Sequence, residues 1–371
     1  MPTLARYDLY KLCLPLGREI GDNMCHYSAF NVCVLRLEPA DGQVGWGYGE
    51  KAADGHFAKE ASWNRRMPPV ETIRQAFEST YWPRMRGESV HSLKHRQPSP
   101  FPGDSYLELA IRYALWDLVG QAAGLPLYRY LGATEKPRRV LTTVCGCEFP
   151  QPLEWVLDFV QAKLDEGVNS FKLKVGHEDP QWDIDRLMAI RDRVGPEVEL
   201  GVDANIAWTA REALDWVERV EVQAGNLKLS FLEDPLAPDD FEGYRLLARD
   251  CPVPVVGHDY INDPARLRPL LDTGALARLR VRDGLDYGLQ ARALAEEYDL
   301  PLDCCNTFLE VGLHFALACP RVERIEFADL GWNALPEHPV RLVDGQLQLT
   351  DVPGHGLAPD RETLNQFVTH D

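Results

Sequence analysis

The stretch Ser170–Gly176, SFKLKVG, carries two lysines two residues apart in a predicted β-strand. Alternate side chains of a strand point to the same face, so Lys172 and Lys174 share one face. Ammonium groups on a buried face are costly unless anions lie near them. The stretch therefore predicts nearby carboxylates or an anionic ligand, and the alternative is a solvated edge strand with two surface lysines.

Each of the next three predicted strands ends in a carboxylate, namely Asp203 in LGVDAN, Glu233 in SFLEDP and Asp259 in VGHD. A single Asp at such a place usually caps the following helix, but the caps here are expected at Thr209 and Asp263. Three carboxylates at one barrel mouth would repel one another without a cation. Hard oxygen ligands with room for water and substrate favour Mg²⁺, and Mn²⁺ accepts the same ligands. Zn²⁺ prefers His or Cys.

From about Arg138 onward, short apolar strand candidates alternate with amphipathic helices. Successive strands lie roughly 20 to 30 residues apart, about the length of one βα unit of a barrel. A doubly wound open sheet would alternate in the same way, but it gives no reason for polar residues at the end of every strand. We therefore predict a parallel (β/α) barrel, with strands centred near Val140, Phe171, Leu200, Leu229, Val255, Leu279, Leu302 and Ile325.

The first third of the chain has a different pattern, in which strands precede helices. Residues 30–37 (FNVCVLRL) and 44–50 (VGWGYGE) are predicted strands joined by a turn at Asp41-Gly42. The glycines of the second strand lead to no helix, so they do not indicate a phosphate-binding loop. Helices are expected near 70–81 and 104–123, which makes this part an α+β module.

The composition is that of a globular protein with an acidic bias. The 371 residues include 39 Lys and Arg against 57 Asp and Glu, giving a formal net charge of −18. Hydrophobic residues at 45% and charged residues at 26% exclude wholesale disorder. Nucleic acids and anionic membranes would repel such a chain in the absence of a long Lys/Arg run, so we expect neither as a partner.

The N-terminal residues indicate no export. Charged residues interrupt the apolar residues of positions 1–20, namely Arg6, Asp8, Lys11 and Arg18. No signal peptide is therefore expected. No stretch approaches the length of a membrane span. The 9 cysteines are therefore interpreted as reduced, buried thiols of a cytoplasmic protein.

The motifs K-x-K, D-x-N, E-D-P and G-x-D follow one another in order, preceded by ALWDL at 114–118, PLY at 126–128 and LG at 131–132. Each motif alone is weak, but the ordered set is specific. It resembles the enolase superfamily, in its mandelate racemase and muconate lactonizing enzyme branch, over nearly the whole chain.

The resemblance implies an α+β capping domain at 1–135 that closes over a (β/α)7β barrel at 136–350. The segment 351–371 is expected to pack back on the capping domain. It also implies a Mg²⁺ held by Asp203, Glu233 and Asp259, and Lys174 as the base that removes a proton α to a carboxylate. The metal and Lys172 would stabilise the resulting enediolate, and Lys172 is expected to depress the pKa of Lys174.

The chain departs from the family pattern at the sixth and seventh barrel strands. Members that resemble mandelate racemase end these strands in Asp and His, a dyad that supplies a second base, and the muconate branch has Lys on strand six. By family spacing the two positions here are Arg282 and Asn306. A guanidinium stays protonated and an amide does not titrate, so neither can serve as a base.

The remaining candidate residues are assigned to substrate binding. Arg282 suits a second carboxylate or a sugar hydroxyl, and Glu326 at the end of strand eight would lie near the substrate carboxylate. The capping loops 17–27 and 51–63 are expected to set specificity. The other candidates are Asn205, Asn306, His26, Tyr27 and His56.

Only one face of the substrate is thus equipped with a base, which favours a one-base reaction over racemisation. The predicted function is Mg²⁺-dependent dehydration of a hydroxy acid, an acid sugar or diacid, to a 2-keto acid. A racemase, epimerase or cycloisomerase of the same superfamily is the alternative, and a catalytically silent metal-binding member is a further one. The expected partners are a small carboxylate substrate and further copies of the chain in a homo-oligomer.

Overall fold

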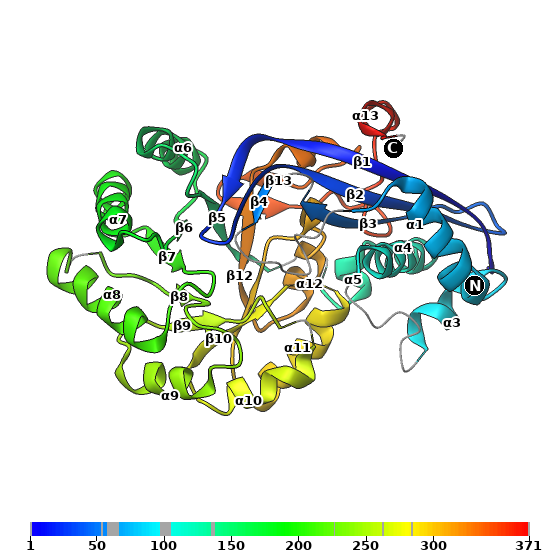
Figure 1. Cartoon of the computed structure of the whole chain (residues 1–371). Helices are drawn as coiled ribbons and strands as arrows, with labels where there is room; N and C mark the ends of the chain where they lie inside the picture. The colour runs from blue at the N-terminus through cyan, green and yellow to red at the C-terminus, as the bar shows by residue number, and fades with distance from the viewer. Residues whose placement is uncertain are drawn as a thin grey trace.

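The computed structural model describes residues 2–52, 55–57, 67–96, 105–134, 138–225, 227–261, 263–282 and 285–369. Eight of the described strands form a closed, parallel barrel in the order β10-β11-β12-β5-β6-β7-β8-β9 (Figure 1). The strands are β5 (Leu141–Cys147), β6 (Ser170–Lys174), β7 (Glu199–Asp203), β8 (Leu232–Glu233), β9 (Val255–Gly257), β10 (Leu276–Val281), β11 (Leu302–Cys304) and β12 (Val322–Ala328).

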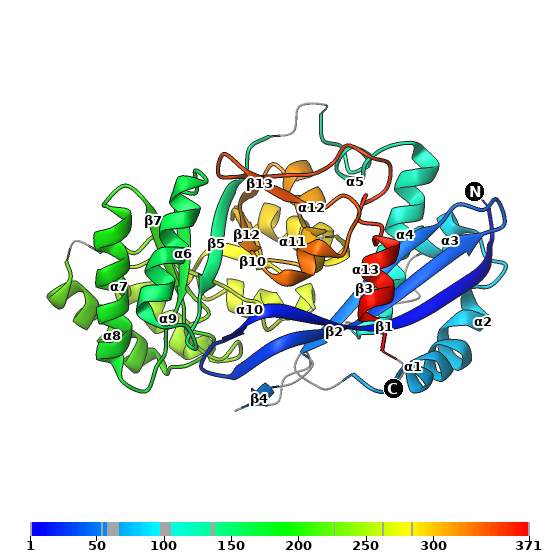
Figure 2. The same cartoon turned by 90° about the horizontal axis from the view of Figure 1, so that it is seen from above.

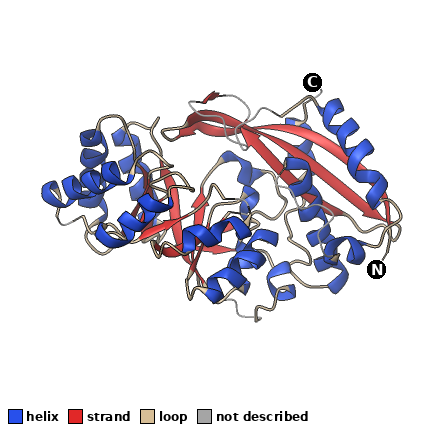
Figure 3. Ribbon diagram, turned by 60° about the horizontal axis from the view of Figure 1, so that its bottom comes forward, coloured by secondary structure: helices blue, strands red, loops and turns tan. Residues whose placement is uncertain are grey.

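Helices connect consecutive strands and cover the outside of the barrel (Figure 3). Their starts follow the expected capping chemistry: Asp179 caps the helix that begins at Pro180, and Thr209 forms a capping box with Glu212. This arrangement confirms the predicted (β/α)7β barrel. The helices are α6 (Leu153–Asp165), α7 (Pro180–Val194), α8 (Ala210–Gln223), α9 (Phe241–Asp250), α10 (Arg268–Leu271), α11 (Asp286–Glu297) and α12 (Leu313–Ala318).

The N-terminal part is an antiparallel sheet, and helix α4 (Tyr106–Ala123) packs on it. Sequence patterns singled out β2 (Cys25–Pro39) and β3 (Gly45–Ala52), but the structure adds a long first strand, β1 (Leu4–Gly21), and a short β4 (Gly55–Phe57). The shorter helices of this part are α1 (Val70–Ala76), which continues through a π-helical turn into α2 (Trp82–Met85), α3 (Val90–His95) and α5 (Leu127–Tyr130).

The glycines of β3 let helix α4 approach the sheet closely. A Cβ atom on Gly47 would lie 1.8 Å from the carbonyl oxygen of Ala110, and one on Gly49 would lie 1.9 Å from that of Tyr106. Any larger side chain would push the helix away. The G-x-G-x-G pattern therefore serves helix packing.

The C-terminal part returns to the N-terminal sheet. After the hairpin of β13 (Arg341–Val343) and β14 (Gln346–Gln348), the chain leads to α13 (Arg361–Phe367), near β1 in Figure 1. Leu12 of β1 forms a β-bridge with Val368, and the Tyr48 hydroxyl donates to the carbonyl of Leu357. The segment after residue 351 thus contacts the capping sheet.

Three sequence-based expectations differ from the structure. The first barrel strand is Leu141–Cys147, so the expected centre at Val140 precedes it, and the fourth is Leu232–Glu233, three residues beyond the expected centre at Leu229. Residues 17–27, expected as a loop, mostly belong to β1 and β2, which meet in a short turn at 22–24. Of the expected loop 51–63, residues 53–54 and 58–63 lie outside the described part. None of the described helices is long and apolar enough to cross a membrane.

Candidate active site

Lys172 and Lys174 of β6 point to the same side and meet carboxylates there. The Lys172 ammonium lies 3.0 Å from Asp203 Oδ2 and 2.9 Å from Glu233 Oε1, and it also contacts Glu326. Lys174 Nζ lies 2.8 Å from Asp203 Oδ2. Lys172 is only 4% exposed. The carboxylates that the SFKLKVG pattern requires are therefore present.

The pKa of Lys174 departs from the direction expected from its neighbour. Burial lowers this pKa most strongly and Lys172 lowers it further, but Asp203 raises it. The net pKa lies well above the usual value for lysine. The expectation that Lys172 depresses this pKa overlooked the carboxylate that contacts both ammonium groups.

The carboxylates of β8 and β9 form a compact group. Ligand oxygens of Glu233, Asp234 and Asp259 can all lie within 4.8 Å of one another. Asp234 joins this group because its backbone has a φ of 43° and its Oδ2 accepts a hydrogen bond from the backbone N–H of Asp259. Asp203, the third predicted ligand, instead accepts hydrogen bonds from the lysines. Asp234 was not predicted, although it stands beside Glu233 in the E-D-P motif.

These carboxylates fit a hard divalent cation. Glu233 Oε2 and Asp234 Oδ1 are buried oxygens without a hydrogen-bond partner among the described residues. Such atoms are costly to bury unless a cation or a donor satisfies them. If all groups ionise, five carboxylates face three cationic side chains, an excess of two negative charges. The carboxylates are Asp203, Glu233, Asp234, Asp259 and Glu326, and the cations are Lys172, Lys174 and Arg280.

Arg280 occupies the core of the site, and sequence reasoning missed it. Its Nε lies 3.1 Å from Asp259 Oδ1, and its Nη2 lies 3.1 Å from Glu233 Oε1 and 2.8 Å from Glu326 Oε1. The guanidinium is 2% exposed. The alternation R-L-R-V-R at 278–282 was the available signal, because it places three arginines on one face of β10.

Arg282, the predicted position, follows β10 and is half-buried, one strand period nearer the barrel mouth. It is close enough to Tyr287 to act on the pKa of that phenol. Family spacing identified the arginine at the mouth, whereas the one that contacts the carboxylates lies two residues deeper.

The end of β11 supplies no titrating base. Cys305 Sγ donates to Asp259 Oδ1 at 2.8 Å, and burial raises the pKa of this thiol well above its usual value. The backbone N–H of Asn306 lies 3.4 Å from Glu326 Oε2. Glu326 itself is buried between Lys172 and Arg280, so its carboxylate joins two barrel walls.

The hairpin between β1 and β2 covers the mouth of the barrel, as Figure 2 shows. Asn23 Nδ2 donates to the carbonyl of Asn205 at 3.4 Å. Asn205 Oδ1 accepts from Lys174 Nζ at 2.8 Å, and its Nδ2 donates to the Tyr260 hydroxyl at 3.0 Å. Asn205 therefore links the cap, Lys174 and Tyr260. Of these residues, Tyr260 was not selected from the sequence.

The other cap candidates are placed less directly. His26 of β2 pairs with His56 of β4 across the sheet, and the side chain of His56 lies outside the described part. Tyr27 packs against Phe30 with ring centroids 5.1 Å apart. Burial raises the pKa of Tyr27, and Lys174 is close enough to oppose that shift.

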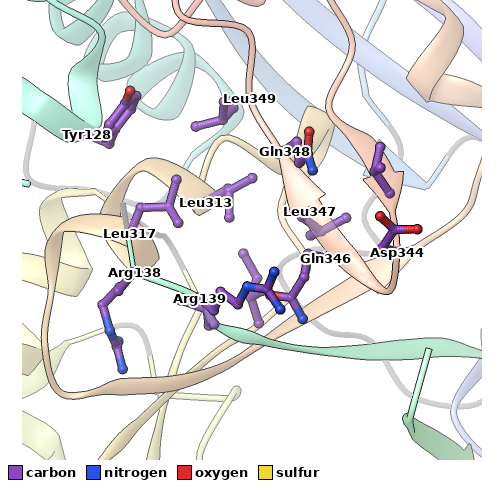
Figure 4. Close-up of a pocket in the computed structure, with 13 residues that line it drawn as sticks. Tyr128, Arg138, Arg139, Leu313, Leu317, Asp344, Gln346, Leu347, Gln348 and Leu349 are labelled. Atoms are coloured by element: carbon purple, nitrogen blue, oxygen red, sulfur yellow. The ribbon is translucent and has the colours of Figure 1, made fainter. Parts of the chain in front are cut away.

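A separate cavity lies at the amino-terminal end of β5, away from these residues (Figure 4). Arg138 and Arg139 line it together with apolar side chains of α12 and the β13–β14 hairpin. None of the predicted site residues lines this cavity. The site chemistry therefore belongs to the carboxyl ends of the strands, where barrels of this kind place it.

Comparisons with known proteins show the family and the fold of this chain. Residues 155–363 match the family described as "Enolase C-terminal domain-like". The chain is 25% identical to 3,6-anhydro-alpha-L-galactonate cycloisomerase of Streptomyces coelicolor, covering 98% of each protein. It is 30% identical to L-Ala-D/L-Glu epimerase of Clostridium acetobutylicum, covering 85% of this chain and 87% of the epimerase. It is 31% identical to L-talarate/galactarate dehydratase of Salmonella typhimurium, covering 66% and 61%.

Solved structures share the whole fold. A candidate mandelate racemase from Mesorhizobium loti superimposes with a TM-score of 0.89 at 28% identity, covering 99% of this chain and 95% of the other. L-talarate dehydratase from Polaromonas sp. JS666, solved with Mg and L-glucarate, gives a TM-score of 0.82 at 23% identity, covering 100% and 98%. Magnesium therefore occurs with this fold in a structural neighbour, beside a small carboxylate ligand.

Proposed function

The chain belongs to the enolase superfamily, in the mandelate racemase and muconate lactonizing enzyme branch, and from this premise we propose that it is a Mg²⁺-dependent hydroxy-acid dehydratase. In this reaction a 2,3-dihydroxy acid loses the proton α to its carboxylate and its β-hydroxyl, and the remaining α-hydroxyl becomes the keto group of a 2-keto acid. The observation that carries the proposal is the difference between opposite barrel walls: lysines line one, and a buried arginine lines the other.

Lys174 is the proposed base. It is the lysine nearer the mouth, and its contacts with Asp203 and Asn205 hold its ammonium at the end of β6. Lys172 lies deeper and contacts three carboxylates, so it would stabilise negative charge on the substrate carboxylate rather than exchange protons.

Glu233 and Asp259 would hold the metal ion, with Asp203 or Asp234 as the third carboxylate. When bound, Mg²⁺ supplies positive charge beside the substrate carboxylate and acidifies the neighbouring α-proton. The same charge opposes the influence of Asp203 on the pKa of Lys174, so the metal would favour the neutral form of this base. The chain's own part is to orient the substrate and to exclude water under the β1–β2 hairpin.

The opposite wall supports a one-base reaction. β10 faces β6 across the barrel, and β11 faces β7. Arg280 keeps its proton, and the buried Cys305 has a raised pKa. Racemisation needs a group that accepts or returns a proton on that side, whereas dehydration does not.

Cycloisomerisation is the second candidate function. Cycloisomerisation also needs only one base. The relative from Streptomyces coelicolor, which aligns with 98% of this chain and 98% of its own length, is a cycloisomerase. A silent metal-binding role has less support, because five carboxylates with two buried cations and the partly buried Lys174 are a costly set for a scaffold.

The direct test is to incubate the protein and Mg²⁺ with a library of aldonates and aldarates and to assay 2-keto acids. The same mixtures in D₂O report exchange of the α-proton even where turnover is poor. Keto-acid formation supports the proposal. If no keto acid forms and a chiral substrate instead racemises with deuterium uptake from both enantiomers, the one-base argument is wrong.

A further inference from the structure

Glu148 is a buried carboxylic acid at the end of the first barrel strand. It follows β5 directly and is 9% exposed. The pairing of β5 with β6 shifts by one residue at Gly146, so that Cys147 pairs with Leu173. Because the strands are parallel, this register brings Glu148 beside Lys174 at the barrel mouth.

The carboxyl group of Glu148 has no hydrogen-bond or salt-bridge partner among the described residues. The charged groups that act on it are Lys174 and Lys172 of β6, Asp22 of the β1–β2 turn and Arg18 of β1. Burial raises the pKa of Glu148 to about 7, although the lysines and Arg18 oppose the shift. A large part of the population therefore carries a proton at neutral pH.

The cap holds this acid in place. The backbone N–H of Phe149 donates to the carbonyl of Gly21 at 3.2 Å, and Gln151 Nε2 contacts the carbonyl of Glu19. Arg18 Nη1 donates to the carbonyl of Asp329 at 3.0 Å, which fixes the hairpin to the end of β12 as well. Glu148 is thus enclosed between β6 and the hairpin, in the region that a substrate of Lys174 would enter.

We infer that Glu148 is a catalytic residue, the acid that protonates the departing β-hydroxyl while Lys174 removes the α-proton. This inference rests on the proposed dehydration. A buried carboxyl beside the base suits the task, because it has a proton to give and no partner among the described residues to hold it.

The proton and electron balance closes. Lys174 takes the α-proton, and the C–H electron pair forms the enediolate. The pair then moves to the α–β bond as the β C–O bond breaks, and the hydroxyl takes the proton of Glu148 and leaves as water. The α-hydroxyl of the substrate makes the product an enol, which becomes the 2-keto acid by gaining a proton at the β-carbon and losing its hydroxyl proton. Lys174 then releases its proton to solvent, and Glu148 regains one from solvent.

The test compares two leaving groups in Glu148→Gln. With a 2,3-dihydroxy acid we expect keto-acid formation to fall at least about 10²-fold, the usual contribution of a general acid. Exchange of the α-proton in D₂O should persist, because Lys174 is intact. With the corresponding β-fluoro acid, elimination should remain near the wild-type rate, because fluoride leaves without a proton.

The pH profile gives an independent readout. In the wild type, keto-acid formation should rise with pH as more Lys174 becomes neutral and should level off near about 7, because Glu148 loses its proton there. In Glu148→Gln the rise should continue without this levelling. Glu154→Gln, the same change on the exposed start of α6, is the matched control and should retain the wild-type rate and profile.

Three results would overturn the inference. They are an unchanged rate with the hydroxy acid, an equal loss with the fluoro acid, and loss of α-proton exchange in Glu148→Gln. Failure of the proposed function looks different, because the wild type itself would then form no keto acid from any hydroxy acid that exchanges its α-proton.

Discussion

Two opposite walls of the barrel carry positive charge in different ways. The lysine side, Lys172 and Lys174 on β6, holds ammonium groups on flexible stems, and one of them lies at the mouth. The arginine side, Arg280 on β10, holds a planar guanidinium fixed by carboxylates on three strands. Lysine can exchange protons, whereas arginine keeps its proton and only positions its partners. The comparison indicates that the lysine side provides proton exchange, whereas the arginine side holds the carboxylates in position.

The first prediction removes the reactive group of the lysine side. Lys174→Ala should abolish exchange of the α-proton in D₂O with metal and substrate present, because it removes the proposed base. Lys172→Met should leave slow exchange, since it removes charge stabilisation and keeps the base. Deuterium incorporation followed by NMR measures both variants, and undiminished exchange in Lys174→Ala would transfer the base role to another residue.

The second prediction concerns the metal between the two walls. Glu233→Gln and Asp259→Asn should each weaken Mg²⁺ binding strongly, and the triple variant with Asp203→Asn should lose both binding and activity. Asp234→Asn separates the two possible third ligands: it should weaken binding more than Asp203→Asn if Asp234 completes the site. Calorimetric titration with Mg²⁺ measures the affinities, and unchanged affinity in the triple variant would refute the site.

The lysine side could be predicted from sequence far better than the arginine side. K-x-K, D-x-N and E-D-P stand at strand ends in fixed order, so alternation and strand polarity place their side chains without knowledge of the packing. The barrel itself followed from the same regularity, and the glycines of β3 were correctly separated from phosphate binding.

The missed residues depend on register and depth, which a single sequence does not encode. Arg280 and Arg282 lie on the same face of β10, and only the three-dimensional structure shows which one meets Glu233. Glu148 owes its position to the one-residue shift at Gly146, and its isolation to a hairpin more than a hundred residues away in the sequence. The raised pKa of Lys174 required knowing that Asp203 contacts both lysines.

The third prediction removes the ordering group of the arginine side. Arg280→Met leaves Glu233, Asp259 and Glu326 without their shared cation, so the free energy of unfolding should fall by about 3–5 kcal/mol, as for other broken buried ion pairs. Arg280→Lys keeps the charge but loses the guanidinium geometry that spans three carboxylates. Its free energy of unfolding should therefore fall less than that of Arg280→Met.

Urea unfolding in a fixed concentration of Mg²⁺ measures these changes. Arg282→Met is the matched control, because the same substitution is made two residues nearer the mouth at a half-buried position, and it should change stability much less. Equal losses in Arg280→Met and Arg282→Met would mean that the deeper arginine has no special role in ordering the site.

The last and smallest effect tests whether helix α12, which contacts β12 and α5, stays uncharged. His314 on α12 is 1% exposed. Its Nδ1 accepts from the backbone N–H of Tyr128 at 3.1 Å, and its Nε2 lies 3.0 Å from the carbonyl of His355. Both contacts are satisfied by a neutral ring with its proton on Nε2. Burial lowers the pKa of His314 to about 3.

This lowered pKa makes stability depend on pH in a definite direction. In the unfolded chain the ring titrates near about 6.5, so at lower pH the unfolded state binds a proton that the folded state refuses. The stability contributed by the neutral ring is thus complete above that pH and is lost as the pH falls toward 3, at about 1.4 kcal/mol per pH unit. Urea unfolding of the wild type and His314→Gln between pH 7 and pH 5 should show a shallower decline in the variant, whereas His338→Gln, at an exposed position, should follow the wild type. Parallel curves for the wild type and His314→Gln would mean that this histidine takes up its proton without unfolding, and helix α12 would then carry charge that can change with pH.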